Sequence, residues 1–434
     1  MDKQMLNAGC HEPEGDPERR DEWAKLPPDL AAEIAGRLLG IDLAEYIRFR
    51  AVCKPWRQST EDPHALHSRF LPRNWVVLVN YLDQFRLNHG DERLSPKENY
   101  GDETTSRKKF RLLNVATGAS LTGVELPGEL SGHHAIGYVE GLLVLWNDVT
   151  SGIRLLNPLT HAVTDLPGFA SIFADASSTA VLENTYQFRG FGFVDGAAAS
   201  SPPAMVVLLG EVFQMIACIR LGDEPRWALV DTSSLSLDGG GTAKVSFRTT
   251  LSLRGRFYMS TSTGDVVTVE LDPEPRLVYV IKQATRAAAR PTTTPFMGSL
   301  DEFYLAPSGG NGDSARTMLM VRRGREKVEV FEVDVDGGKL VPTSTVGTDR
   351  AVFIGSARAL SVSTRLFPSA ATNAVYFCVG LRPVELLFLV VRLDDGCGGD
   401  ELARIPYNDQ VAGPFIGPCN LDVYLAWCVD YVHM

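Results

Sequence analysis

Apolar residues recur at helical spacing in a segment close to the N-terminus. Leu30, Ile34 and Leu38 follow one another at i, i+4 and i+8, which predicts an amphipathic helix with one apolar stripe. Pro28 suits the first turn of that helix, because its missing N–H would have no partner there. Gly40 is expected to end the helix, since glycine is common just past a helix C-terminus.

Two further helices are predicted in the same segment. Asp42 and Glu45 have capping-box spacing and open a helix that carries Leu43. A third, short helix places Cys53 and Trp56 on one face. So small a bundle rarely buries enough surface to fold without a metal, a disulfide or a partner. Its apolar side chains therefore pack either on the rest of the chain or on another protein, and spacing alone does not distinguish these alternatives.

Beyond about residue 75 the pattern changes to short apolar runs separated by turn residues. The run from Arg111 to Ala119 recurs from Arg154 to Ala162 as R-L-L-N-x-x-T-x-A, which is an offset of 43 residues between positions 111 and 154. Propeller blades repeat at a period of about 40–50 residues. Many short strands without intervening helices predict an all-β architecture.

The size of this β region selects among the all-β architectures. Residues 110–432 are too many for one sandwich, and division by the repeat length predicts a β-propeller of six or seven blades. The fold class expected for the whole chain is therefore α+β and multidomain, with a small three-helix domain followed by the propeller. The predicted boundaries are a disordered acidic tail at 1–22, the helical domain at 23–62, a linker with the first strands at 63–109, and the propeller at 110–432.

Composition narrows the classes of partner. The chain of 434 residues has a net charge of −11, which disfavours binding to nucleic acid or to an anionic membrane. The seven cysteines are odd in number and irregularly spaced, which favours free thiols over a disulfide framework or a zinc site. No apolar run approaches the 20 or so residues of a membrane span, and the acidic N-terminus resembles no targeting peptide. A cytoplasmic or nuclear location, or both, is expected.

Motifs that would indicate catalysis are weak. His133-His134 is expected in a solvated loop, and Gly239–Lys244 lacks the Gly-Lys-Ser/Thr ending of a phosphate-binding loop. Asp334–Gly338 lacks the later ligands of a calcium loop and is expected to form a turn. Arg322-Arg323 is expected on a solvated strand edge. We therefore expect no catalytic residue, no cofactor and no metal, and a chain that is not an enzyme.

The N-terminal helical segment resembles an F-box motif. Leu26-Pro27-x-Asp29-Leu30 and Val52-Cys53-Lys54-x-Trp56-Arg57 match its two ends in order, with departures at Leu39–Ile41 and at Tyr46. The resemblance implies a three-helix F-box that docks on the Skp-type linker protein of a cullin–RING ubiquitin ligase. The residues expected to form or support the docking surface are Leu26, Pro27, Leu30, Ile34, Leu38, Leu43, Val52, Cys53 and Trp56.

The β region carries a second resemblance. Gly141–Leu145 followed by Ile153–Thr160 is similar to a blade of the plant F-box companion domain of unknown function 295 type, which resembles a kelch-like propeller. Lys339–Pro342, Ala351–Gly355 and Asn373–Phe377 are similar to further parts of that domain. The resemblance implies the fold and its pairing with an F-box, but no substrate.

Together these patterns predict the substrate-recognition subunit of an SCF-type ubiquitin ligase. The helices would bind the linker and, through it, a cullin, while the propeller would bind a target protein whose binding residues are unknown. Two alternatives stay open. The chain could be an interaction protein that acts outside the ligase, with the helices capping the propeller, or an enzyme or small-ligand sensor that uses the propeller face.

Overall fold

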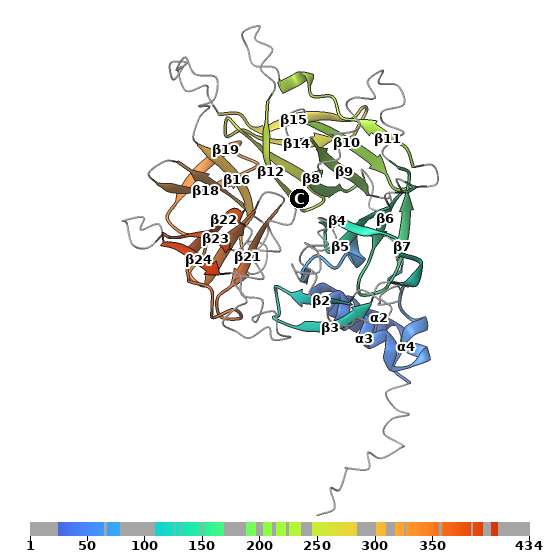
Figure 1. Ribbon diagram of the computed structural model, residues 1–434. Helices are drawn as coiled ribbons and strands as arrows, with labels where there is room; N and C mark the ends of the chain where they lie inside the picture. The colour runs from blue at the N-terminus through green and yellow to red at the C-terminus, as the bar shows by residue number, and fades with distance from the viewer. Residues whose placement is uncertain are drawn as a thin grey trace, which may run out of the picture. The chain divides into compact units, whose positions relative to one another are not determined.

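The computed structural model describes most of the chain between residues 25 and 406 (Figure 1). The described ranges are 25–64, 67–78, 109–125, 127–130, 132–147, 149–150, 152–168, 188–196, 203–210, 214–222, 225–235, 245–283, 301–309, 317–324, 327–355, 358–382, 385–393 and 401–406. The predicted acidic tail at 1–22 and the predicted hairpin at Gly239–Lys244 lie outside the described residues.

The chain divides into two compact units, Met1–Ala65 and Leu66–Met434. The first unit contains the helices α2 (Pro28–Ile41), α3 (Leu43–Val52) and α4 (Lys54–Gln58). Pro28 stands in the first turn of α2, as predicted. Gly40 does not end that helix, because the chain remains helical until the Asp42 N–H bonds to the Leu38 carbonyl at 2.9 Å.

The start of α3 also differs from the prediction. Asp42 is the N-cap and has an extended backbone, but its side chain makes no capping hydrogen bond, so the expected capping box with Glu45 is not formed. Cys53 is the N-cap of α4, and Pro55 lies in the first turn, where its ring is tolerated. The three predicted helices are therefore present, but α2 ends later than predicted and α3 lacks the predicted capping hydrogen bonds.

The second unit is a six-bladed β-propeller whose six sheets form a ring (Figure 1). Its strands in chain order are β1 (Trp75–Leu78), β2 (Lys109–Asn114), β3 (Ser120–Glu125), β4 (His134–Val139), β5 (Leu142–Trp146), β6 (Ile153–Leu156), β7 (Val163–Leu166), β8 (Phe188–Val194), β9 (Ala204–Leu209), β10 (Met215–Arg220), β11 (Trp227–Leu229), β12 (Phe247–Leu253), β13 (Arg256–Thr261), β14 (Val266–Glu270), β15 (Arg276–Ile281), β16 (Glu302–Pro307), β17 (Met318–Arg323), β18 (Val328–Asp334), β19 (Lys339–Thr343), β20 (Arg350–Ile354), β21 (Ala359–Ser363), β22 (Ala374–Arg382), β23 (Glu385–Arg392) and β24 (Glu401–Pro406). The single-turn helices η1 (Ser68–Phe70), η4 (Gly128–Leu130) and η5 (Ser233–Leu235) lie between strands or before them. Because β1 pairs with β2, the propeller begins before residue 110.

Blade length explains why the propeller has six blades and not seven. The strands β4, β8, β12 and β16 each open a sheet, and they begin at His134, Phe188, Phe247 and Glu302, which are about 55 residues apart. The 43-residue repeat therefore underestimates the average blade, and division by it overestimates the number of blades. The alternative of six blades in the prediction is confirmed.

Neighbouring sheets meet along edge strands. β4 contacts β8, β8 contacts β12, β12 contacts β16, and β16 contacts β21. Five of the sheets are antiparallel throughout, whereas β20 pairs in parallel with β22 in the sheet ordered β21-β20-β22-β23-β24. At Gly192 on β8 a Cβ atom would lie 1.9 Å from the Phe257 ring, so glycine is required where these two sheets approach each other.

The hydrophobic core lies between the sheets. The strands β5 and β9 are buried at every position, which accounts for their continuous apolar sequences, since strands covered on both faces do not alternate. The outer strands β7, β11 and β19 are exposed at most positions or only half-buried. In these sheets the side chains of the inner strands are therefore buried, and those of the outer edge strands are more exposed.

The sequence repeat corresponds to one turn built twice. Asn114 Oδ1 accepts from the backbone N–H groups of Ala116 and Thr117 at 2.9 and 3.1 Å between β2 and β3. Asn157 Oδ1 accepts from the equivalent N–H groups two and three residues on, at 3.0 and 3.3 Å, between β6 and β7. The left-handed position of the turn is Gly118 in the first copy and His161 in the second. The asparagine and the threonine shared by the two copies are therefore the residues that fix the turn, since Thr117 and Thr160 accept from the N–H groups of Ala119 and Ala162 at 3.3 Å.

Candidate functional site

The candidate site is the surface of the first unit, and it depends on which side chains the unit buries. α2 turns Ala31 and Ala35 inward, and each is 1% exposed. α3 buries Leu43, Tyr46 and Phe49. Small residues on α2 allow close approach of the helices, so little of the large apolar surface of α2 is needed for the interior of the unit.

The larger apolar side chains of α2 lie on its exposed side. Leu30 is 48% exposed and Ile34 is 39% exposed, although ordinary packing would place such residues inside. Ile41 at the end of α2 and Val52 at the end of α3 are also exposed. Ile41 was not among the predicted site residues, because the expected helix ended before it.

The predicted docking residues therefore fall into three groups. Pro27, Leu30, Ile34 and Val52 are exposed, and Leu43 is buried within the structure. The half-buried members are Leu26, Leu38, Cys53 and Trp56. The exposed group is available for contact, whereas Leu43 supports the helices from inside.

Trp56 is held by an aromatic partner that sequence reasoning missed. Its ring stacks on Phe49, with 4.3 Å between the ring centroids and 14° between the planes. Stacked rings of this kind stabilise packing beyond their buried area. Phe49 and Trp56 lie on different helices, separated by the extended backbone of Cys53, so no helical periodicity relates them and the sequence pattern carried no signal for the pair.

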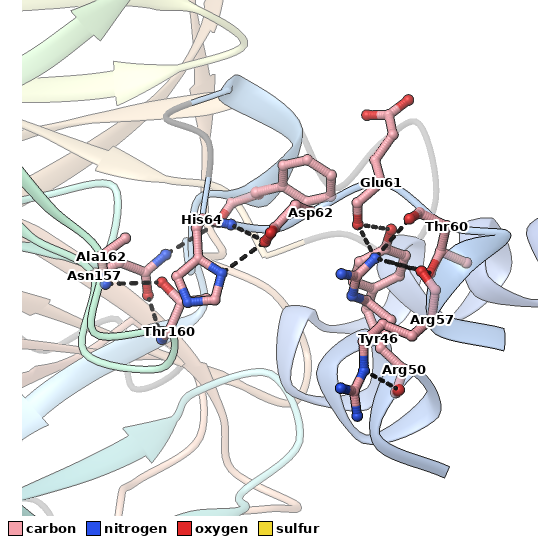
Figure 2. Close-up of polar contacts among 11 residues, drawn as sticks. Tyr46, Arg50, Arg57, Thr60, Glu61, Asp62, His64, Asn157, Thr160 and Ala162 are labelled. Atoms are coloured by element: carbon pink, nitrogen blue, oxygen red, sulfur yellow. Dashed lines mark hydrogen bonds and ion pairs between the residues drawn. The ribbon is translucent and has the colours of Figure 1, made fainter. Parts of the chain in front are cut away.

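The end of the helical unit is tied back to α3 by two side chains (Figure 2). The Tyr46 hydroxyl donates to the Glu61 carbonyl at 2.8 Å. Arg50 Nη1 donates to the Thr60 carbonyl at 2.7 Å and also to the carbonyl of Glu61. Tyr46, which departs from the F-box pattern, therefore fixes the segment after α4.

An Asp62–His64 contact follows this segment. The backbone N–H of His64 donates to Asp62 Oδ1 at 3.0 Å, and the His64 ring lies 2.6 Å from the same atom. These hydrogen bonds, the backbone one first, hold the pKa of the Asp62 carboxyl below its usual range. Both residues are exposed, so the contact defines a turn and not a buried site.

The motifs weighed for catalysis in the propeller are structural in the described residues. Asp334 Oδ1 accepts from the Gly337 N–H at 2.8 Å in the hairpin between β18 and β19, so the predicted turn is confirmed. His133 is buried, contrary to the expected solvated loop. Among the residues that the structure describes, no cluster of three or more His, Cys, Asp or Glu side chains could hold a metal ion.

The predicted strand edge at Arg322 and Arg323 is wrong. β17 pairs with β16 on one side and β18 on the other, so neither arginine lies on an edge. Arg322 bonds Asp301 at 2.6 Å and Glu329 at 2.9 Å, and both partners are only partly exposed. These carboxylates neutralise the arginine, which argues against a phosphate site here.

The comparisons with known proteins concern the propeller. The family model described as KIB1-4 beta-propeller matches residues 110–409. The chain belongs to this family. A search of curated proteins finds no match.

Two solved structures are similar to the chain over 70% of its length. A proposed 6-phosphogluconolactonase from Bacteroides uniformis is 13% identical, is covered over 78% of its own length and has a TM-score of 0.29. The beta-propeller domain of Vanderwaltozyma polyspora Nup133 is 11% identical, is covered over 83% of its own length and has a TM-score of 0.32.

Within the described part of the chain, no helix has both the length and the apolar character needed to cross a membrane.

Proposed function

We propose that the chain is an F-box protein, the substrate-recognition subunit of an SCF-type cullin–RING ubiquitin ligase. The first unit would bind a Skp-type linker, and the propeller would bind a target protein. The observation that carries this proposal is the exposure of Leu30 and Ile34 on a helix that buries only alanines. Apolar side chains at such spacing are the usual anchors of a helix in a partner's groove.

The propeller supports the proposal in a more general way. The family match gives a fold that presents loops and strand edges to other molecules, and such folds commonly serve as interaction platforms. In this proposal the chain itself catalyses no reaction. It holds the target near a ubiquitin-charged conjugating enzyme and so raises the effective concentration of the target's lysines. The kelch-like character and the cytoplasmic or nuclear location belong to the same proposal.

The test is binding of a purified Skp-type linker to the full chain. We expect the double substitution Leu30→Asp plus Ile34→Asp to reduce affinity at least about 100-fold, since two buried carboxylates replace two apolar anchors. The matched control is Ala32→Asp plus Gly36→Asp, which has the same spacing and charge. Both control positions are exposed, and a Cβ atom at Gly36 meets nothing within 4 Å.

The outcomes separate clearly. Loss of binding in the first variant and retention in the control support the assigned surface. Undiminished binding of the Leu30/Ile34 variant contradicts the surface, and absence of binding by the unsubstituted chain contradicts the function.

A further inference from the structure

A group of cations lies at the end of α3 and on α4, and we call it the α4 cationic cluster: Arg50, Lys54 and Arg57. Arg50 Nη1 donates to the Arg57 carbonyl at 3.3 Å, and Arg57 Nε donates to the Arg50 carbonyl at 3.3 Å. These reciprocal bonds hold the two guanidinium side chains at one end of the helical unit (Figure 2). Lys54 is the first residue of α4 and is exposed.

The cations of this cluster lack the carboxylate partners that the other arginines of the helices have. Arg37 pairs with Glu33 at 2.7 Å, and Arg48 pairs with Glu45. Within the described residues, neither Lys54 nor Arg57 has a carboxylate at ion-pair distance. The Arg50 guanidinium donates to carbonyls and to a hydroxyl, and Asp62, the carboxylate that its charge influences, is hydrogen-bonded to His64. Like charges held together repel each other and favour an anionic partner.

An exposed apolar residue adjoins the cluster. Val52 is 63% exposed and stands between Arg50 and Lys54 in the chain. The junction of α3 and α4 therefore exposes both positive charge and an apolar side chain, which is the chemistry that an acidic peptide with interspersed uncharged residues would complement.

The chain itself contains such a peptide just before α2. Residues 12–22 carry six carboxylates against two arginines, Arg19 and Arg20, and the carboxylates belong to Glu12, Glu14, Asp16, Glu18, Asp21 and Glu22. This segment can reach the cluster. About ten extended residues span up to ~33 Å, whereas α2 is only about 21 Å long and packs against both α3 and α4.

We propose that residues 12–22 bind the α4 cationic cluster and Val52 and act as an autoinhibitory segment. Docked there, the segment covers one end of the exposed surface and competes with the partner of the helices. The competition with a linker rests on the function proposed above, whereas the contact between segment and cluster does not.

The contact is tested on the full chain without any partner. A carbodiimide joins a carboxylate directly to an amine, so we expect a cross-link between Lys54 and residues 12–22, located by mass spectrometry. It should be independent of protein concentration and lost in 1 M salt, where the screening length is about 3 Å. Arg57→Gln should reduce the yield severalfold, whereas the control Arg37→Gln should not. A yield at Lys54 no higher than at Lys339, an exposed lysine of the propeller, would overturn the proposal.

The competition is tested by neutralising the six carboxylates to the corresponding amides in the full chain. We expect linker affinity to rise about three- to tenfold at low salt, which corresponds to two or three exposed ion pairs, and the two chains to converge at high salt. Unchanged affinity, or weaker binding because the partner itself uses the acidic segment, would overturn autoinhibition while leaving the proposed function intact. If neither chain binds the linker, the proposed function fails, and the cross-link still decides whether the contact exists.

Discussion

The rings of Phe49 and Trp56 stack face to face across the junction of α3 and α4, 4.3 Å apart. Cys53 lies between them in the chain and has an extended backbone, so the two short helices meet at an angle that this pair secures. A helix of five residues has little stability of its own, and tertiary packing must supply it. The stacked pair is therefore the main contact that we expect to hold α4 in place.

Replacement of Trp56 by alanine should destabilise the helical unit by about 2 kcal/mol, because a half-buried aromatic ring and its stacking are lost. The measurement is hydrogen exchange of the α3 amides in the full chain, which reports opening of this unit separately from the propeller. The control Trp56→Phe keeps a stacking ring and should cost less than half as much. Equal protection of α3 in the alanine variant and the unsubstituted chain would refute the role of the pair.

The two copies of the asparagine turn differ at the residue with positive φ, so exchange of residue type should have a different effect on stability in each copy. Gly118 has φ +74° and His161 has φ +60°. Gly118→Ala should destabilise the propeller by about 1 kcal/mol, since L-residues are disfavoured in this region. Its Cβ would meet only Leu366 at 4.0 Å, so the cost comes from the backbone and not from a clash.

The reverse change at His161 should be close to neutral. His161→Gly relieves the same backbone cost, but glycine loses about 0.5–1 kcal/mol more conformational entropy on folding. Chemical denaturation of the two single variants gives the comparison. A neutral Gly118→Ala variant would show that the left-handed conformation does not limit this turn.

Arg322 should contribute to stability more than its neighbour Lys327. Arg322→Gln leaves Asp301 and Glu329 without their shared partner, and we expect a loss of about 1–2 kcal/mol in urea denaturation. Lys327→Gln is the control, because that side chain is 71% exposed and such pairs contribute at most ~1 kcal/mol. Equal effects of the two substitutions would argue against the bridging role of Arg322.

Because of Cys218, the free energy of unfolding of the propeller should fall as the pH rises into the alkaline range. Burial raises the pKa of its thiol to about 11, above the value of an exposed thiol near 9. Between these values the unfolded chain releases the proton and the folded chain retains it, so this group lowers stability as pH rises from about 9 to 11. The free-energy difference between the unsubstituted chain and Cys218→Ala should therefore decrease from pH 8 to pH 10.5, and a constant difference would contradict the buried thiol.

The features predicted correctly, such as turns and strands, are mostly those that depend on a few neighbouring residues. The turn at Asp334–Gly338 was expected where it is observed, between Val328–Asp334 and Lys339–Thr343, because turn residues act over a few positions. The 43-residue repeat indicated a propeller because it marks the same local turn in two blades. The number of blades depends on loop lengths that vary from blade to blade, and a repeat seen in only two copies does not sample them.

Spacing identified the residues of the candidate site but did not decide which way they face. It left open whether the stripe of Leu30, Ile34 and Leu38 packs on the rest of the chain or on another protein, and only the F-box resemblance placed it on a docking surface. In the structure Leu30 and Ile34 are exposed, and the buried face of α2 is made by Ala31 and Ala35. Periodicity identifies the two faces of a helix, but which face turns inward depends on how closely its neighbours approach. The failure of the Asp42 capping box has the same cause, since side-chain geometry at a helix junction is set by packing beyond the local pattern.

The bond from Tyr46 to the Glu61 carbonyl sets the smallest fragment in which the helices can be studied alone. A peptide that stops at the end of α4 would leave the buried phenol without its acceptor and Arg50 without three of its own. Such a peptide would fray from its C-terminal end, and a weak affinity measured with it would say nothing about the intact chain. Excised domains should therefore retain at least the residues up to His64.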